Sequence, residues 1–116
     1  MADVLVDTDI FVDHLRGHRA LVPGRNRVFY SVITRAELFA GRGANEDPIR
    51  ELLSPFAEVE VTGAIAETAG RLRREVSVSL PDALIAAMAI HGEMTLLTRN
   101  RRDYDRVHGL HVRSPS

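Results

Sequence analysis

Four acidic residues lie beside short apolar segments of the sequence, either just after a strand-like run or near the start of a helical one. Three of them come just after a run rich in Val, Ile and Leu, and the fourth stands near the start of a helical pattern; these are Asp7, Glu37, Asp103 and Asp82. If the runs are parallel strands of one sheet, their carboxyl ends meet at one edge, where ligand sites form in such sheets. The sequence therefore predicts four carboxylates close together.

Carboxylates gathered at one edge raise one another's pKa, and nothing in a sheet-and-helix fold requires such a gathering. A hard divalent cation removes this penalty, since Mg²⁺ and Mn²⁺ prefer oxygen ligands and take one or two direct carboxylates together with water. Such ions bind a phosphate, lower the pKa of a water and neutralise charge at the leaving oxygen. The pattern therefore indicates metal-assisted hydrolysis of a phosphodiester.

Each acid also has an ordinary structural explanation. Residues 34–37 and 79–82 both fit the capping-box pattern of a helix N-terminus, which would place Glu37 in a first helical turn. Asp9 is expected to cap a helix that begins at Ile10, and Asp13 is expected to be solvated. Taken one at a time, these explanations are sufficient, and it is the convergence of four acids that favours a functional site.

The elements that must position these acids follow from hydrophobic periodicity. Strand-like runs cover 4–6, 28–32, 59–61, 95–98 and 110–112, and helical patterns cover 10–16, 34–41, 48–56, 63–76 and 81–91. The last helix is apolar all round, which is typical of a buried helix. Strands that alternate with helices predict an α/β fold in which a small parallel sheet of about five strands is flanked by helices.

Composition narrows the class of protein. The 116 residues predict one domain, and the formal net charge of −1 disfavours a protein that coats nucleic acid by bulk charge. There is no cysteine and every basic residue is arginine, which excludes thiol catalysis, Walker A loops and Schiff-base lysines. No apolar run approaches the ~20 residues of a membrane span, and because the N-terminal residues lack a charged segment followed by a long apolar one, we expect no secretory signal. We therefore expect a cytoplasmic protein with no membrane contact.

Four stretches carry the four acids, and their sequences are 4–8 (VLVDT), 31–38 (SVITRAEL), 80–87 (LPDALIAA) and 97–104 (LTRNRRDY). In this order and at these spacings they resemble the PIN domains of VapC-type toxins, from bacterial or archaeal toxin–antitoxin pairs, over almost the whole chain. The resemblance implies a PIN-like three-layer fold across residues 1–116 and the activity of an endoribonuclease that depends on Mg²⁺ or Mn²⁺. It carries the acidic quartet of the family onto Asp7, Glu37, Asp82 and Asp103.

Within this resemblance, Asp7 and Asp82 are the first choices for direct metal ligands, and the other two acids complete the site directly or through water. Thr8, Thr98 and Asp9 are expected to contact these carboxylates and orient them without binding the metal themselves. For the two threonines, the alternative is an ordinary role in a turn or a helix cap. The chain departs from the family in its length, since it is short for the family and compact over residues 14–30, and at two single positions. Asp9 stands where many relatives have Asn or Ser, and Tyr104 stands where Phe is usual.

Arginines crowd around the last acid and are candidates to hold RNA phosphates; they are Arg99, Arg101, Arg102 and, further on, Arg106. The alternative is a solvated loop with internal ion pairs to Asp103 and Asp105. The resemblance also implies protein partners, namely a VapB-type antitoxin and a second copy of the toxin in a homodimer, within a larger toxin–antitoxin assembly.

Two other functions stay open at this point. A catalytically silent PIN-like module that binds RNA or protein is expected to have lost one of the four acids, and none is missing here. A phosphatase of the haloacid dehalogenase type is suggested by Asp7-Thr8-Asp9 after a strand, but that class expects Thr or Val where Phe11 stands.

Overall fold

Five short strands form one parallel sheet, and the computed structural model describes residues 2–115 of the chain. The strands are β1 (Asp3–Val6), β2 (Arg27–Ser31), β3 (Ala57–Val59), β4 (Thr95–Leu97) and β5 (Val112–Arg113). Their order in the sheet is β3-β2-β1-β4-β5, with Leu5 paired to Phe29 on one side and to Leu96 on the other. The predicted parallel sheet of about five strands is therefore confirmed.

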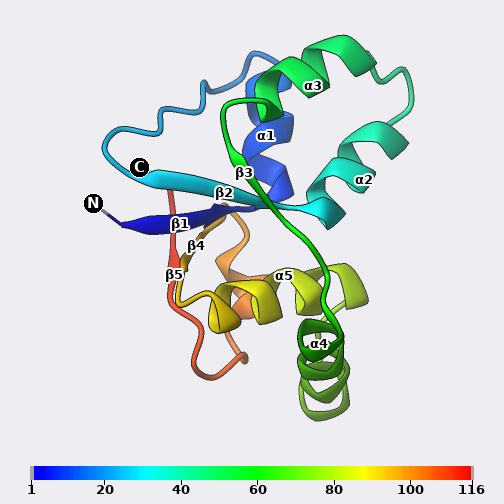
Figure 1. Ribbon diagram of the computed structural model, residues 1–116, viewed down its shortest axis with the longest axis vertical. Coiled ribbons are helices and arrows are strands. Elements are labelled where there is room, and N and C mark those ends of the chain that lie inside the picture. The colour runs from blue at the N-terminus through cyan, green and yellow to red at the C-terminus, as the bar shows by residue number, and fades with distance from the viewer. Residues whose placement is uncertain (1, 116) are drawn as a thin grey trace.

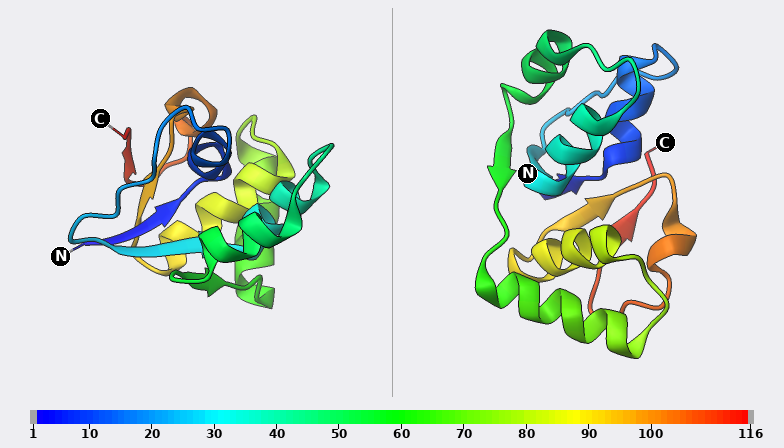
Figure 2. Two further views of the ribbon diagram at one scale, coloured as in Figure 1. Left: turned by 90° about the horizontal axis from the view of Figure 1, so that it is seen from above. Right: turned by 90° about the vertical axis from the view of Figure 1, so that its right-hand side faces the viewer.

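Helices cover both faces of this sheet (Figure 1). α1 (Thr8–Leu15), α2 (Val32–Ala40) and α3 (Glu46–Leu53) lie on one side, and α4 (Gly63–Glu75) and α5 (Leu80–His91) lie on the other. The right-hand view of Figure 2 shows the two helical layers separated by the strands. A short 3₁₀ helix, η1 (Arg101–Tyr104), follows β4. These layers confirm the three-layer α/β prediction.

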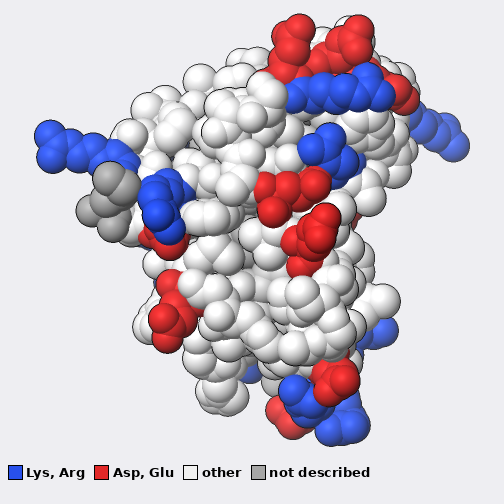
Figure 3. Space-filling view, in the orientation of Figure 1, with Lys and Arg blue, Asp and Glu red and all other residues white. Residues whose placement is uncertain are grey.

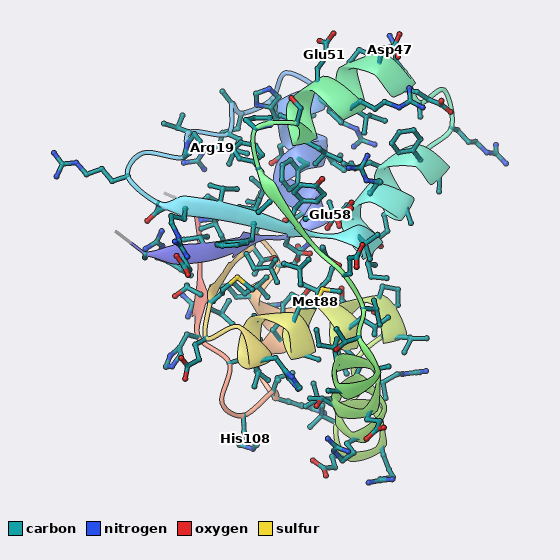
Figure 4. The ribbon with its side chains drawn as sticks, in the orientation of Figure 1. Arg19, Asp47, Glu51, Glu58, Met88 and His108 are labelled. Atoms are coloured by element: carbon teal, nitrogen blue, oxygen red, sulfur yellow. The ribbon has the colours of Figure 1, made fainter. Side chains whose placement is uncertain are left out.

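Alternation along β1 explains why each face of the sheet has its own core. Val4 and Val6 point to the layer of α1 and α3, whereas Leu5 points to the layer of α5. All three are at most 1% exposed, as expected for a central parallel strand covered on both faces. Helix α5 is buried, as its all-round apolar pattern predicts, and its Met88 lies between the helix and the sheet (Figure 4).

Several element boundaries differ from the prediction, and strand pairing explains the shifts. β3 covers 57–59 rather than 59–61 because its partner β2 ends at Ser31, which pairs with Val59. β5 covers 112–113 rather than 110–112 because Leu96 and Leu97 pair with Val112 and Arg113. The remaining strands and helices lie within a few residues of their predicted positions.

The predicted start of α2 is also wrong. The helix begins at Val32 rather than at Thr34, because the Ser31 hydroxyl accepts a hydrogen bond from the Ile33 amide at 2.9 Å and caps the helix there. Residues 34–37 therefore do not form a capping box, and Glu37 lies in the second turn instead of the first. In the described part of the chain, no helix combines the length and apolar character needed to cross a bilayer.

Candidate active site at the carboxyl edge of the sheet

The chain changes direction across the sheet between β1 and β4. From β1 it proceeds outward through β2 to β3, and it then returns to the other side of β1 to form β4 and β5. The connections that leave β1 and β4 therefore diverge, which opens a crevice at their carboxyl ends. A hollow of about 380 Å³ lies there, and it is lined by all four predicted acids, Asp7, Glu37, Asp82 and Asp103, together with Thr8, Asp9, Val12, Asp13, Arg16, Arg99 and Asn100.

Asp7 is the most firmly held of the four acids. It is 6% exposed, and its Oδ1 accepts the Thr8 amide at 2.9 Å. Its Oδ2 accepts the Thr98 hydroxyl at 2.8 Å and the Tyr104 hydroxyl at 3.1 Å. The backbone here is extended, so Asp7 also caps α1. The prediction that Asp9 caps this helix is therefore wrong, because α1 begins at Thr8, one residue after the cap.

Burial dominates the electrostatics of Asp7. Loss of water raises the pKa of its carboxyl from an ordinary 3.8 to about 6, against the opposing effect of hydrogen bonds from Thr98, Thr8 and Tyr104. The neighbouring Asp9 carboxylate adds to the increase. A carboxylate that is buried in spite of its loss of hydration is typical of functional sites. A bound cation would offset this loss.

Glu37 reaches the hollow from α2 and is held through a chain of hydroxyl groups. The Thr8 hydroxyl donates to Glu37 Oε1 at 2.7 Å, and it lies 2.8 Å from the hydroxyl of Thr34. Since Thr8 gives its proton to Glu37, the buried Thr34 must donate to Thr8. Thr34 is thus a supporting residue that the sequence analysis missed, because its motif suggested a helix cap.

Asp82 enters from the first turn of α5. The Ser79 hydroxyl accepts the Asp82 amide at 3.3 Å, so the predicted capping box at 79–82 is confirmed at its Ser side. The Asp82 side chain is half-buried, and its Oδ1 accepts the Tyr104 hydroxyl at 3.1 Å. Tyr104 therefore touches both Asp7 and Asp82, a contact that the sequence analysis did not anticipate.

Asp103 and the nearby arginines stand at the exposed rim. Asp103 lines the hollow from η1 and is exposed. Within residues 2–115, Arg101, Arg102 and Arg106 form no salt bridge, so the predicted alternative of ion pairs to Asp103 and Asp105 is not found. Arg99 instead pairs with Asp13.

Two acids of α1 tie this helix to the segment that follows β4. Asp13 is buried and bonds Arg99, so the prediction that Asp13 is solvated is wrong. Asp9 Oδ2 accepts the Arg99 amide and the Asn100 side chain, both at 3.0 Å. These contacts, rather than a helix cap, place Asp9 beside the other acids. Burial raises the pKa of Asp9.

The donor set of this hollow fits a hard divalent cation. Asp9 Oδ1 is buried and has no hydrogen-bond partner among the described residues, and the acids that line the hollow offer only oxygen. No three acidic or histidine side chains within residues 2–115 converge into a ready-made cage. Mg²⁺ does not need one, since it usually keeps several waters and takes one or two carboxylates. A second hollow of about 470 Å³ lies beside α1 and β5 but lacks this group of acids.

Comparisons with known proteins agree with this architecture. The PIN domain family model matches residues 4–110. Ribonuclease VapC19 of Mycobacterium tuberculosis is 36% identical over 115 residues, covering 86% of this chain and 90% of its own length. The toxin–antitoxin complex from Klebsiella pneumoniae contains a chain with a TM-score of 0.80 and 32% identity, covering 97% of this chain and 98% of that one.

A further solved structure shows the same fold at lower identity. It is VapBC2 from Rickettsia felis bound to a DNA fragment, with a TM-score of 0.81, 23% identity and coverage of 97% and 98% of the two chains. The alternative of a haloacid dehalogenase-type phosphatase, suggested by residues 7–9, is therefore wrong. The chain belongs to the PIN-domain family and, within it, to the VapC ribonucleases.

Proposed function

We propose that this chain is the endoribonuclease toxin of a toxin–antitoxin pair and that it cleaves RNA phosphodiester bonds at the carboxylate hollow. One observation carries the assignment of the site: four acids from four separate segments line a single hollow at the point where the strand order reverses. Packing and helix capping do not require four carboxylates to share one space, and their mutual repulsion opposes it.

Asp7 and Asp82 are the proposed direct ligands of Mg²⁺ or Mn²⁺, and Glu37 and Asp103 complete the site directly or through water. When bound, such an ion supplies a more acidic water and neutralises charge on the phosphate. The remaining residues position the carboxylates: Thr98 holds Asp7, and Thr8 holds Glu37. Asp9 joins α1 to the segment after β4, so that the two sides of the hollow keep a fixed position relative to each other.

RNA is held in this proposal by arginines rather than by bulk charge. On the face shown in Figure 3, acidic and basic side chains lie next to one another and no large area is purely basic. Arg101 and Arg102 are exposed beside Asp103 and are proposed to contact phosphates. Arg99 is proposed to do the same with the guanidinium donors that its pair with Asp13 leaves free.

The partners follow from the family. A VapB-type antitoxin, a homodimer of the toxin and a larger toxin–antitoxin assembly are proposed, since the K. pneumoniae relative was solved as a toxin–antitoxin complex. A cytoplasmic location fits an RNA substrate. Residues 1–116 are proposed to form one domain, because β1 and β5, from the two ends of the chain, belong to one sheet.

The test is cleavage of tRNA and ribosomal RNA by the purified chain with Mg²⁺, Mn²⁺ or EDTA. Discrete fragments are expected with either metal and none with EDTA or with Asp82→Asn. Asp105→Asn is the matched control, because Asp105 is an exposed acid next to η1 that does not line the hollow. Equal cleavage by parent and Asp82→Asn would remove Asp82 from the mechanism. Binding of RNA without cleavage in any metal would favour a silent binding module.

A further inference from the structure

The buried Tyr104 hydroxyl lies between two of the acids that line the hollow. Its oxygen lies 3.1 Å from Asp7 Oδ2 and 3.1 Å from Asp82 Oδ1, so one oxygen touches carboxylates from two different elements. We propose that Tyr104 is a positioning residue, whose hydroxyl holds the Asp7 and Asp82 carboxylates together toward the hollow and so prepares them for a divalent cation. This inference rests on the proposed function and adds a residue to its machinery.

The tyrosine ring is suited to this role because it is packed in the core. Tyr104 is 1% exposed, and its ring is part of the core between the sheet and α5, together with Leu5, Leu96 and Ala86. A phenol keeps its proton at neutral pH, and this one proton is shared between the two carboxylate oxygens, each 3.1 Å from the hydroxyl. Because the packed ring fixes the position of the hydroxyl, the hydroxyl in turn restricts the positions of the carboxylates that it contacts.

The two carboxylates depend on this hydroxyl to different degrees. Asp7 also accepts hydrogen bonds from Thr98 and from its neighbour Thr8, so it keeps two donors without Tyr104. The Asp82 carboxylate accepts a hydrogen bond only from Tyr104 among the described residues. Loss of the hydroxyl should therefore release mainly Asp82, whose half-buried side chain would then have to be ordered when a cation binds.

Tyr104→Phe removes one oxygen and keeps the ring. Tyr30→Phe is the matched control, since Tyr30 is 2% exposed and its hydroxyl accepts a hydrogen bond from Arg35 at 2.8 Å, outside the residues that line the hollow. The primary measurement is calorimetric titration of the full chain with Mn²⁺ in the absence of RNA. We expect Tyr104→Phe to bind Mn²⁺ about tenfold more weakly, or about 1.4 kcal/mol, and Tyr30→Phe to stay within about twofold of the parent.

Cleavage as a function of Mn²⁺ concentration gives a second readout that a general loss of stability would not produce. In Tyr104→Phe the half-saturating Mn²⁺ concentration should rise by the same factor as the dissociation constant, and the rate should return to the parent value at high Mn²⁺. Replacement of Tyr104 by 4-aminophenylalanine, which keeps a donor at the end of the ring, should restore the parent affinity. This third protein also keeps the inference testable if Tyr104→Phe does not fold.

The outcomes distinguish failure of the Tyr104 role from failure of the proposed ribonuclease function. Mn²⁺ binding by Tyr104→Phe that equals or exceeds the parent affinity would overturn the inference, since the hydroxyl would then be neutral or would compete with the cation. Failure of 4-aminophenylalanine to restore affinity in a folded protein would overturn it as well. A parent protein that neither binds Mn²⁺ nor cleaves RNA would instead refute the proposed function.

Discussion

The buried Asp7 carboxyl should make the metal-free protein less stable at neutral pH than in mild acid. Its pKa is raised from 3.8 to about 6 in the folded protein, so the folded state binds this proton more tightly than the unfolded state. The stabilisation from the protonated carboxyl is therefore complete below about pH 4 and is lost as the pH rises through 6. The difference between the two pKa values corresponds to roughly 3 kcal/mol.

Asp7→Asn tests this cost directly. The amide keeps an oxygen for the Thr8 amide, and its NH₂ group can donate to the hydroxyls of Thr98 and Tyr104, which accept as well as donate. We expect the variant to match the parent near pH 4 and to be more stable by up to roughly 3 kcal/mol at pH 7.5, while losing cleavage.

The assay is urea unfolding of both proteins in EDTA at half-unit intervals from pH 4 to 8. Asp105→Asn, which changes an exposed carboxyl at the end of η1, should leave the pH dependence of the parent in place. A parent whose stability rises between pH 4 and 6 in a way that Asp7→Asn abolishes would refute the reasoning. A gap between parent and variant that does not change with pH would refute it equally.

Three further perturbations address the support of the site. Ser79→Ala removes the cap of α5 and should lower the free energy of unfolding by about 1 kcal/mol in urea, with reduced cleavage because Asp82 shares that turn. Asp13→Asn breaks the pair with the half-exposed Arg99 and should cost about 1–2 kcal/mol by the same assay, with no loss if the pair is only a surface contact. Arg101→Gln with Arg102→Gln should raise the KM for RNA at unchanged kcat and reduce the slope of log affinity against log salt by about two. Arg25→Gln should do neither, because Arg25 is an exposed arginine in the turn before β2, at the amino ends of the strands and away from the hollow at their carboxyl ends.

The elements and the acids of the site could be predicted because their signals are local. The apolar run 4–6, the all-round apolar stretch of α5 and the Ser79 cap each lie within one short window of sequence. The four acids are recognisable because each stands beside such a window, three of them after a strand-like run and Asp82 at the start of a helix. The cap of α1 is different, because Asp7 and Asp9 fit the same local pattern. The choice depends on where β1 ends, and the Asp7 amide settles this by donating to the Leu97 carbonyl at the other end of the chain.

Two of the interactions that escaped prediction join the two ends of the chain. Arg99 to Asp13 and Tyr104 to Asp7 span 86 and 97 residues. No window of sequence contains both partners, so the sequence predicts a solvated Asp13 and indicates no role for the Tyr104 hydroxyl. The same property has a consequence for the molecule. Because Thr98 and Tyr104 both bond Asp7, the segment from β4 to η1 positions this carboxylate as well as completing the sheet beside β1.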